Sequence, residues 1–309
     1  MTREVEHQIS VDAPAAEVYR LIAEVENWPR IFPPTVHVEC DERTADEERI
    51  RIWATARGEA KSWTSRRRLD PDGLRIDFRQ EVSTPPVAAM GGAWVVEPTA
   101  DGCLVRLLHD YRAVDDDPAQ LEWLDGAVDR NSRAELDALK RNVEAVAGEG
   151  ERLLSFEDSV RVRGEAKDVF AFLDEAGLWE ERLPHVARVA LREDSPGLQE
   201  LEMDTRAKDG STHTTKSVRV CFPHHRIVYK QTTLPPLMTL HTGCWTLEDH
   251  GNGITTVTSQ HTVVLDPANI PRVLGTGVTT EEAGVFVHNA LSTNSRTTLE
   301  HAKRYAEGR

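Results

Sequence analysis

An internal repeat is the feature that most restricts the fold of this chain. Residues of the same or a similar type recur 151 positions apart, and this spacing holds over more than 75 positions. The matched residues are Val18 and Val169, Tyr19 and Phe170, Trp28 and Trp179, Pro33 and Pro184, Ile76 and Ile227, and Trp94 and Trp245. A repeat of this length indicates two copies of one domain. We place the domains at residues 1–150 and 151–309, with a linker formed by Gly148, Glu149 and Gly150.

Each copy has the same predicted order of elements: a strand, two short helical segments, a run of strands and a long helix. In the first copy the strands are expected near residues 5–11, 35–42, 47–57, 60–69, 73–82, 92–98 and 102–113, and the long helix after Pro118. This order predicts the α+β class, with a curved antiparallel sheet wrapped around a C-terminal helix in the helix-grip architecture. Such a sheet does not fill its concave side, so a cavity is expected between sheet and helix.

The repeat spacing changes near the end of the chain. Asn294, Ser295 and Arg296 match Asn131, Ser132 and Arg133 at a spacing of 163. The second copy has therefore gained 12 residues, which we place at positions 267–277, before its long helix.

Composition and charge exclude several classes of protein. Hydrophobic residues make up 39% and charged residues 29%, as in folded proteins. The net charge of −15 argues against a nucleic-acid or anionic-membrane partner, because phosphate groups attract cationic surfaces. The sequence has no apolar run of about 18 residues and no apolar N-terminal signal segment, so we expect a cytoplasmic protein. The four cysteines lack metal-binding spacing, and we expect reduced thiols, no metal site and no cofactor.

The segment from Lys61 to Leu69 alternates as a strand and places one cation on an aromatic face. Trp63, Ser65 and Arg67 share that face, whereas the other face is polar throughout. One interpretation of Arg67 is a structural ion pair or a side chain that reaches out to solvent. The other is a guanidinium that binds the oxygens of a ligand.

Two further polar residues are predicted to face the same interior. In the strand over residues 102–113 the odd positions are apolar apart from His109, so His109 points inward. On the long helix, Ser132 and Glu135 fall within the apolar stripe. Alone, each has an ordinary structural explanation, but three buried polar groups of complementary type, together with Trp63 and Trp94, are harder to explain as packing.

Three more residues are expected at the ends of the cavity. Trp28 and Phe32 lie in the two short helical segments and would either cover the core or bind a ligand. Met90 lies in the segment 84–92, whose prolines and two glycines predict a flexible cover over the cavity mouth.

The second copy keeps only part of this pattern. Ser217, Arg219 and Trp245 repeat Ser65, Arg67 and Trp94. Gln260 is assigned to the position of His109 and Thr298 to that of Glu135, while His261 is assigned by parity to the opposite face. Glutamine and threonine bind ligands but do not transfer protons near neutral pH. We therefore expect a binding or docking domain.

The motifs that carry these residues resemble a known family. Trp63-Thr-Ser-Arg-Arg67, Asn27-Trp-Pro-Arg-Ile-Phe-Pro-Pro34, His109-Asp110 and Asp129-Arg-Asn-Ser-Arg-Ala-Glu-Leu136 are similar to segments of the aromatase/cyclases of bacterial type II polyketide synthases. Those proteins have the START/Bet v 1-like fold, and the duplicated length resembles their di-domain class. The resemblance implies that Arg67, His109 and Glu135 are catalytic. Some relatives use a tyrosine in the region where this chain has Thr35.

The resemblance implies a reaction on a carrier-bound poly-β-ketone: aldol closure of the first ring, dehydrative aromatisation, or both, with C7–C12 regiochemistry. An acyl carrier protein and other synthase components would be the partners. Aldol closure requires a base and a group that binds the enolate oxygen, roles that His109 and Arg67 could fill, with Glu135 assisting the elimination. Two alternatives stay open: a non-catalytic START-like carrier of a hydrophobic molecule, and an interaction module with a filled core.

Overall fold

The computed structural model describes residues 2–56, 58–145, 152–206 and 210–309. The chain divides into two compact units, residues 1–147 and 148–309. The linker predicted at Gly148, Glu149 and Gly150, and with it the predicted boundary, lies outside the described residues.

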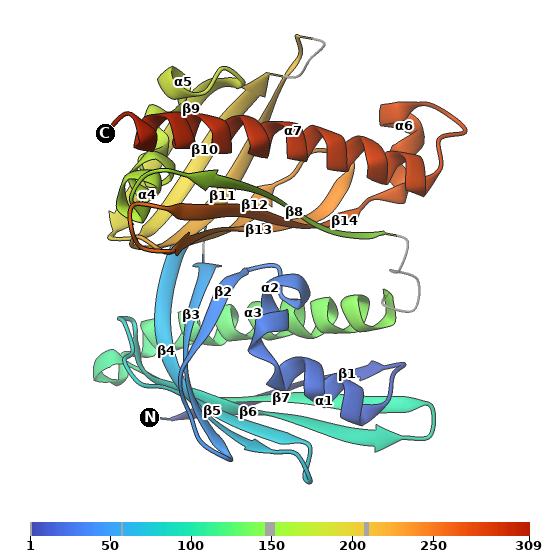
Figure 1. Cartoon of the computed structure of the whole chain (residues 1–309). Helices are drawn as coiled ribbons and strands as arrows, with labels where there is room; N and C mark the ends of the chain where they lie inside the picture. Colours follow the sequence, from blue (N-terminus) through green and yellow to red (C-terminus); the bar gives the residue numbers. More distant parts are fainter. Residues whose placement is uncertain (1, 57, 146–151, 207–209) are drawn as a thin grey trace. The chain divides into compact units, whose positions relative to one another are not determined.

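The first unit is a seven-stranded antiparallel sheet with a long helix across one face (Figure 1). Its elements are β1 (Arg3–Val11), α1 (Ala15–Ala23), η1 (Val25–Asn27), α2 (Trp28–Ile31), β2 (Thr35–Arg43), β3 (Glu47–Ala56), β4 (Glu59–Asp70), β5 (Arg75–Gln80), β6 (Val87–Thr99), β7 (Gly102–Ala113), η2 (Val114–Asp116) and α3 (Pro118–Ala145). The strand order is β1-β7-β6-β5-β4-β3-β2. The helix begins where Asp117 Oδ1 accepts the backbone N–H groups of Ala119 (2.8 Å) and Gln120 (3.0 Å).

The second unit repeats this arrangement. Its elements are β8 (Leu153–Val162), α4 (Ala166–Asp174), η4 (Ala176–Leu178), α5 (Trp179–Arg182), β9 (Val186–Ser195), β10 (Leu198–Arg206), β11 (Thr212–Phe222), β12 (Arg226–Thr233), β13 (Met238–Asp249), β14 (Thr255–Leu265), η5 (Pro267–Asn269), α6 (Ile270–Leu274) and α7 (Thr280–Glu307). The strand order β8-β14-β13-β12-β11-β10-β9 matches that of the first sheet. Thr279 and Glu282 form a capping box at the start of α7. The predicted α+β fold of two helix-grip domains is confirmed.

The core of each unit lies between its sheet and its helices. In the first unit, Leu107 on β7 and Leu139 on α3 are fully buried in one cluster with Ile22 of α1. In the second unit, Leu173, Ile227 and Leu299 lie in the equivalent cluster. Alternate residues of each strand therefore face the helix, which defines the inner face of each sheet.

The net gain of the second domain lies at two places. Pro98 pairs with Cys103 across the β6–β7 turn, whereas Asp249 pairs with Thr255 across the β13–β14 turn, which is one residue longer. The rest of the gain forms η5 and α6, within the predicted region. The extra turn residue shifts every later strand position by one.

Candidate active site

A row of paired residues crosses the inner face of the first sheet. Arg67 on β4 pairs with Phe78 on β5, and Gly92 on β6 pairs with both Phe78 and His109 on β7. Directly paired residues of an antiparallel sheet point to the same face. Arg67 and His109 therefore share the inner face, but at about 4.8 Å per strand their backbones lie roughly 14 Å apart.

Gly92 has a packing role in this row. A Cβ atom there would lie 1.9 Å from the backbone oxygen of Leu108 and 2.9 Å from Cζ of Phe78. The missing side chain lets the Phe78 ring contact His109 edge to face, with ring centroids 5.6 Å apart. The prediction of a flexible cover at residues 84–92 is wrong for its second half, because β6 begins at Val87 and both glycines lie in paired strand.

The Arg67 guanidinium is held by protein groups. Nη1 donates to the backbone oxygen of Ile22 (3.1 Å), and Nη2 donates to that of Ala23 (2.7 Å) and to the Glu48 carboxylate. Arg67 is 3% exposed, and its guanidinium lies 5.4 Å from the ring centroid of Trp28. Nε is the one guanidinium nitrogen without a partner among the described residues. These contacts fix the C-terminal end of α1, as the structural interpretation of Arg67 expects.

Three of the predicted substrate-binding residues form an aromatic wall. The rings of Trp28 and Phe32 meet edge to face at 5.5 Å, and Phe32 lies 6.0 Å from Trp94. Trp28 Nε1 also donates to Ile22 (3.0 Å), which joins this wall to the Arg67 contacts.

The other predicted binding residues are more dispersed. Trp63 is half-buried beside a cluster that contains Ile52, its cross-strand partner. Ser65 is buried, but its hydroxyl donates to the backbone oxygen of Arg79 (3.0 Å), so it is engaged by the sheet. Met90 faces inward opposite Tyr111, near the N-terminal part of α3.

His109 is joined to the long helix through Ser132. The Ser132 hydroxyl lies 3.3 Å from Nδ1 of His109, and Ser132 is 1% exposed. Because Nδ1 is engaged, Nε2 is the ring nitrogen available to a ligand. Glu135 follows Ser132 by three residues on α3, so the two side chains lie on the same helix face. The structure thus joins His109 to Ser132 and places Glu135 about one helical turn further along the same face of α3, whereas Arg67 lies apart from them.

Burial shifts the pKa values of both His109 and Glu135. It lowers the pKa of His109 to about 4, with a smaller effect of nearby His7 in the same direction. It raises the pKa of Glu135 to about 7. Near neutral pH the imidazole is therefore uncharged, and the carboxyl group is divided between its two protonation states. Both side chains keep partial solvent exposure, so a ligand can reach them.

A second histidine on the inner face was missed by the sequence prediction. His7 on β1 pairs with Leu107, and its Nε2 lies 2.9 Å from Oδ1 of Asp129 on α3. Its Nδ1 is buried without a hydrogen-bond partner among the described residues. The alternation of Val5, His7 and Ile9 in β1 was the available signal.

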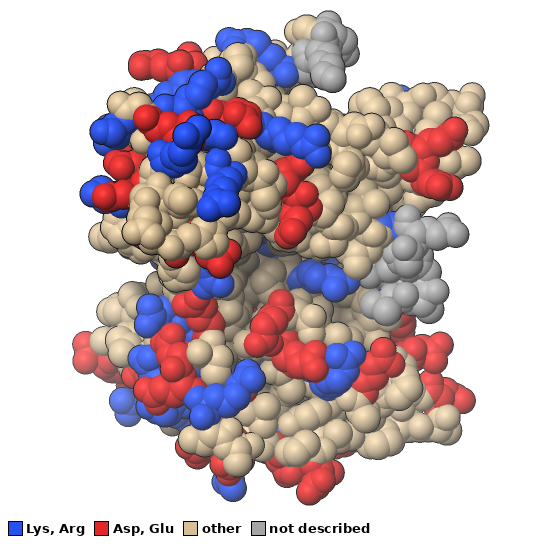
Figure 2. All heavy atoms as spheres, viewed as in Figure 1, with Lys and Arg blue, Asp and Glu red and all other residues tan. Residues whose placement is uncertain are grey.

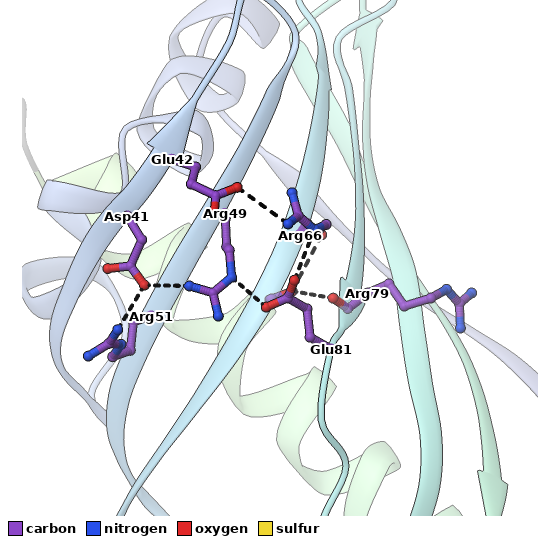
Figure 3. A network of polar contacts seen from close by, with 8 residues as sticks. Asp41, Glu42, Arg49, Arg51, Arg66, Arg79 and Glu81 are labelled. Carbon is purple, nitrogen blue, oxygen red and sulfur yellow. Dashed lines mark hydrogen bonds and ion pairs between the residues drawn. The ribbon is translucent and has the colours of Figure 1, made fainter.

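The outer face of the first sheet carries ion pairs instead (Figure 3). Arg49 binds Asp41 (2.8 Å) and Glu81 (2.7 Å), and Arg66 binds Glu81 (2.9 Å) and Glu42 (3.3 Å). Acidic and basic side chains are similarly interspersed over the visible surface (Figure 2). Exposed pairs of this kind contribute little to stability.

An open groove of about 620 Å³ also lies over this sheet. Its lining includes the outer-face residues Arg66, Arg68, Asp77, Arg79 and Asp110, and also Arg67, Phe78, Gly92 and His109 of the paired row. By strand alternation the outer-face residues point away from α3. Most of the lining residues therefore lie on the face opposite the predicted chamber, which is expected between sheet and helix.

The second domain repeats the arginine contacts. Arg219 is 2% exposed, donates to Gln199 Oε1 (2.8 Å) and to the backbone oxygen of Leu173 (2.6 Å), and lies 5.1 Å from the ring centroid of Trp179. Burial lowers its pKa. Gln199 stands where the first domain has Glu48. The duplication of these contacts supports a structural role for the arginine in both domains.

The assignment of Gln260 to the position of His109 is wrong. Gln260 lies on the outer face and donates to Ser155 (3.2 Å) and Thr262 (2.8 Å). His261 is 4% exposed and pairs with Gly243, as His109 pairs with Gly92. The longer β13–β14 turn reverses the parity and brings His261 inward. The second domain therefore retains its inner histidine.

His261 also retains the contact with the long helix. Its Nε2 lies 2.6 Å from Oγ of Ser295, which corresponds to Ser132. Thr298, three residues further along α7, donates to the backbone oxygen of Asn294 (3.0 Å) and has no carboxyl group. Glu135 is thus the acid/base group that the second interior lacks.

A cavity of about 130 Å³ lies between sheet and helix in the second domain. Ser217, Arg219, Trp245 and Thr298 line it, together with His261. Four of the five residues predicted for this pocket therefore contact one space.

The described part of the chain has neither a cluster of metal-binding side chains nor a membrane-spanning helix. No group of three or more His, Cys, Asp or Glu side chains in residues 2–56, 58–145, 152–206 and 210–309 could hold a metal ion. In those same ranges, no helix has the length and apolar character needed to span a membrane.

The fold and the two interiors define a tandem pair of helix-grip domains, each with a histidine and a serine facing the space between sheet and helix. Residues 2–144 and residues 154–307 both match the family described as polyketide cyclase / dehydrase and lipid transport. The chain belongs to this family and contains two copies of its domain.

Full-length relatives share the two-domain organisation. The chain is 54% identical to the granaticin polyketide synthase bifunctional cyclase/dehydratase of Streptomyces virginiae over 96% of this chain and 97% of the relative. It is 46% identical to the actinorhodin polyketide synthase bifunctional cyclase/dehydratase of Streptomyces coelicolor, over 96% and 95%. Among solved structures, the di-domain ARO/CYC BexL from the BE-7585A biosynthetic pathway is 66% identical, with a TM-score of 0.93 over 99% of both chains.

Proposed function

We propose that this protein is a bifunctional cyclase/dehydratase of aromatic polyketide biosynthesis and that its first domain carries out the reaction. The full-length relatives with that name support the activity. The observation that carries the assignment to the first domain is Glu135, a carboxyl group with a raised pKa that lies about one turn of α3 from the contact between Ser132 and His109. The substrate would be a carrier-bound poly-β-ketone, closed between C7 and C12, with an acyl carrier protein as partner.

His109 is proposed as the base of ring closure. Its lowered pKa keeps it uncharged near neutral pH, so Nε2 can accept a proton from a methylene group between two carbonyls. The resulting enolate carbon attacks a ketone carbon of the same chain, and a carbon–carbon bond forms as that ketone oxygen gains charge. Ser132 holds the ring by Nδ1 during this transfer.

Glu135 is proposed as the acid. With a pKa of about 7, a large fraction of the carboxyl groups is protonated at neutral pH and can donate to the new alkoxide. In the dehydration, loss of a second proton from the attacking carbon and protonation of the hydroxyl release water and form the double bond. The aromatic wall of Trp28, Phe32 and Trp94 would pack against the new ring.

Arg67 is proposed as a positioning residue rather than the group that binds the enolate oxygen. Two of its three nitrogens bind α1 and Glu48, and its backbone lies three strands from His109. Through Ile22 and Trp28 it fixes the wall against which the substrate would lie.

Reconstitution with a minimal synthase tests this proposal. Glu135→Gln and His109→Gln should each reduce the yield of correctly cyclised, aromatic product, on the order of a hundredfold. Glu122→Gln, on an exposed position of the same helix, is the matched control and should retain wild-type yield. Wild-type product from both folded active-site variants would favour the alternative of a non-catalytic carrier.

A further inference from the structure

The cavity of the second domain contains polar atoms that the protein leaves unpaired. His185 Nδ1, Gln231 Oε1 and His241 Nδ1 are buried and have no hydrogen-bond partner among the described residues. All three residues line the cavity, and His241 is 2% exposed. Buried polar atoms are nearly always paired, so three on one cavity indicate a ligand that pairs with them.

The hydrogen bonds around His241 indicate which partner it requires. Its Nε2 lies 2.9 Å from Nδ1 of His261, and the Tyr229 hydroxyl lies 3.0 Å from the same nitrogen. If Tyr229 donates to Nδ1 of His261, that nitrogen is an acceptor, and His241 must donate from Nε2. A neutral imidazole carries one N–H, so Nδ1 of His241 is then an acceptor.

Both imidazoles of this network are uncharged near neutral pH. Burial lowers the pKa of His261 to about 4 and that of His241 to about 3. Gln231 Oε1 is an acceptor in any state. With Tyr229 as the donor to His261, the cavity therefore presents two neutral acceptors, Gln231 Oε1 and His241 Nδ1, to a ligand that donates hydrogen bonds. These groups carry no charge that would attract an ion.

The size and the apolar lining restrict the ligand further. Trp179, Trp245 and Leu201 line the same space as these acceptors. Its volume is about 130 Å³, and an apolar cavity of about 150 Å³ accommodates a benzene molecule. This volume therefore limits the ligand to about one ring, and hydroxyl groups on the edge of that ring would reach the acceptors in the lining.

From these observations we infer that the second domain has its own binding site for a single uncharged, hydroxylated aromatic ring, recognised by Gln231 and His241. The inference draws on the proposed function only for the source of this ligand, because aromatisation of a poly-β-ketone yields hydroxylated rings. The site would then hold a ring formed in the first domain.

Titration calorimetry of the full chain with resorcinol, a benzene ring with two hydroxyl groups, tests the site. We expect binding to wild type, and binding at least about tenfold weaker in Gln231→Leu and in His241→Phe, because each loses an acceptor. Gln260→Leu is the matched control, since it makes the same substitution on the outer face of the same sheet. Toluene, which has the ring but no hydroxyl groups, should bind much more weakly than resorcinol.

Two results would overturn the inference. One is equal affinity for toluene and resorcinol, which would make the cavity purely apolar. The other is loss of resorcinol binding in Glu135→Gln but not in Gln231→Leu, which would place the ligand in the first domain. Because binding is measured without substrate turnover, failure of the cyclase assay would leave this result standing, and failure of binding would leave the cyclase assay standing.

Discussion

Glu135 distinguishes the interior of the first domain from that of the second. Ser132 contacts Nδ1 of His109, and Ser295 contacts Nε2 of His261. Three residues later the first helix has Glu135 where the second has Thr298. A carboxyl group with a pKa near 7 exchanges protons at neutral pH, and a threonine does not. The difference in acid/base chemistry proposed between the two domains therefore depends on this one side chain.

The raised pKa of Glu135 predicts a measurable effect on stability. Its pKa rises from an ordinary value of about 4.3 in the unfolded chain to about 7 in the fold. Between these values the unfolded chain releases the proton and the folded chain keeps it, so the free energy of unfolding falls as pH rises. Glu135→Gln should remove this loss. Its free energy of unfolding should therefore rise by roughly 2–3 kcal/mol relative to that of wild type between pH 5 and pH 8.

Urea unfolding at both pH values measures this effect. The exposed Glu122→Gln is the control and should show no change in its difference from wild type between pH 5 and pH 8. If the difference in free energy of unfolding between Glu135→Gln and wild type were also independent of pH, the raised pKa would be contradicted.

At the scale of the elements, the arginine contacts hold the end of α1 to the sheet. In the first domain this cation has a buried carboxylate partner, Glu48, which is 6% exposed. In the second domain the corresponding Arg219 has the neutral partner Gln199. Removal of the arginine therefore leaves a buried carboxylate in the first domain and a neutral amide in the second.

Arg67→Met should destabilise the protein by about 1–3 kcal/mol, because Glu48 loses its buried partner and keeps only the exposed Arg43 (2.8 Å) as a cation. The double variant Arg67→Met/Glu48→Met should recover most of this loss, since it leaves no buried charge. Chemical unfolding of the single and double variants measures the coupling. Additive losses in the double variant would show that the ion pair is not what stabilises the end of α1.

Much of the fold could be predicted from alternation and repetition. The strand pattern placed Arg67 and His109 on one face, and the repeat placed Arg219 and Trp245 at equivalent positions. Sequence could not show that Arg67 binds Glu48, since that contact depends on the pairing of β3 with β4 and on where α1 ends.

The assignment of Gln260 failed for a different reason. Which residues of a strand face inward can be predicted across a turn only if the turn length is known. The β13–β14 turn is one residue longer than its counterpart. A one-residue shift moves every later side chain to the other face. Counting the repeat from Trp245 alone therefore put Gln260 inside and His261 outside.

At the scale of the whole molecule, the two domains contain different sets of residues whose pKa values are shifted by burial. In the second domain burial lowers the pKa values of His185 and His261 to about 4 and that of His241 to about 3. In the first domain the lowered pKa of His109 is accompanied by the raised pKa of Glu135. The two kinds of shift have opposite effects on stability between pH 5 and pH 7.

The domains should therefore respond differently to acid. A histidine with a lowered folded pKa loses stability as pH falls below its unfolded value of about 6.5, by about 2 kcal/mol at pH 5 for each independent group. Protonation of Glu135 stabilises the first domain over the same pH range and offsets the destabilising effect of His109. In the second domain, several histidines all lower the free energy of unfolding as pH falls. From pH 7 to pH 5 the melting temperature of the second domain should fall by on the order of 10 °C more than that of the first.

Scanning calorimetry at the two pH values can follow both transitions. Glu135→Gln identifies the first domain, because without the compensating carboxyl group that domain should become acid-sensitive. His241→Phe identifies the second, because it removes one buried imidazole and should reduce the acid shift. Equal changes in melting temperature for the two wild-type transitions would show that the buried histidines do not cause a difference in acid stability. That result would contradict the assignment of His241 and His261 as uncharged.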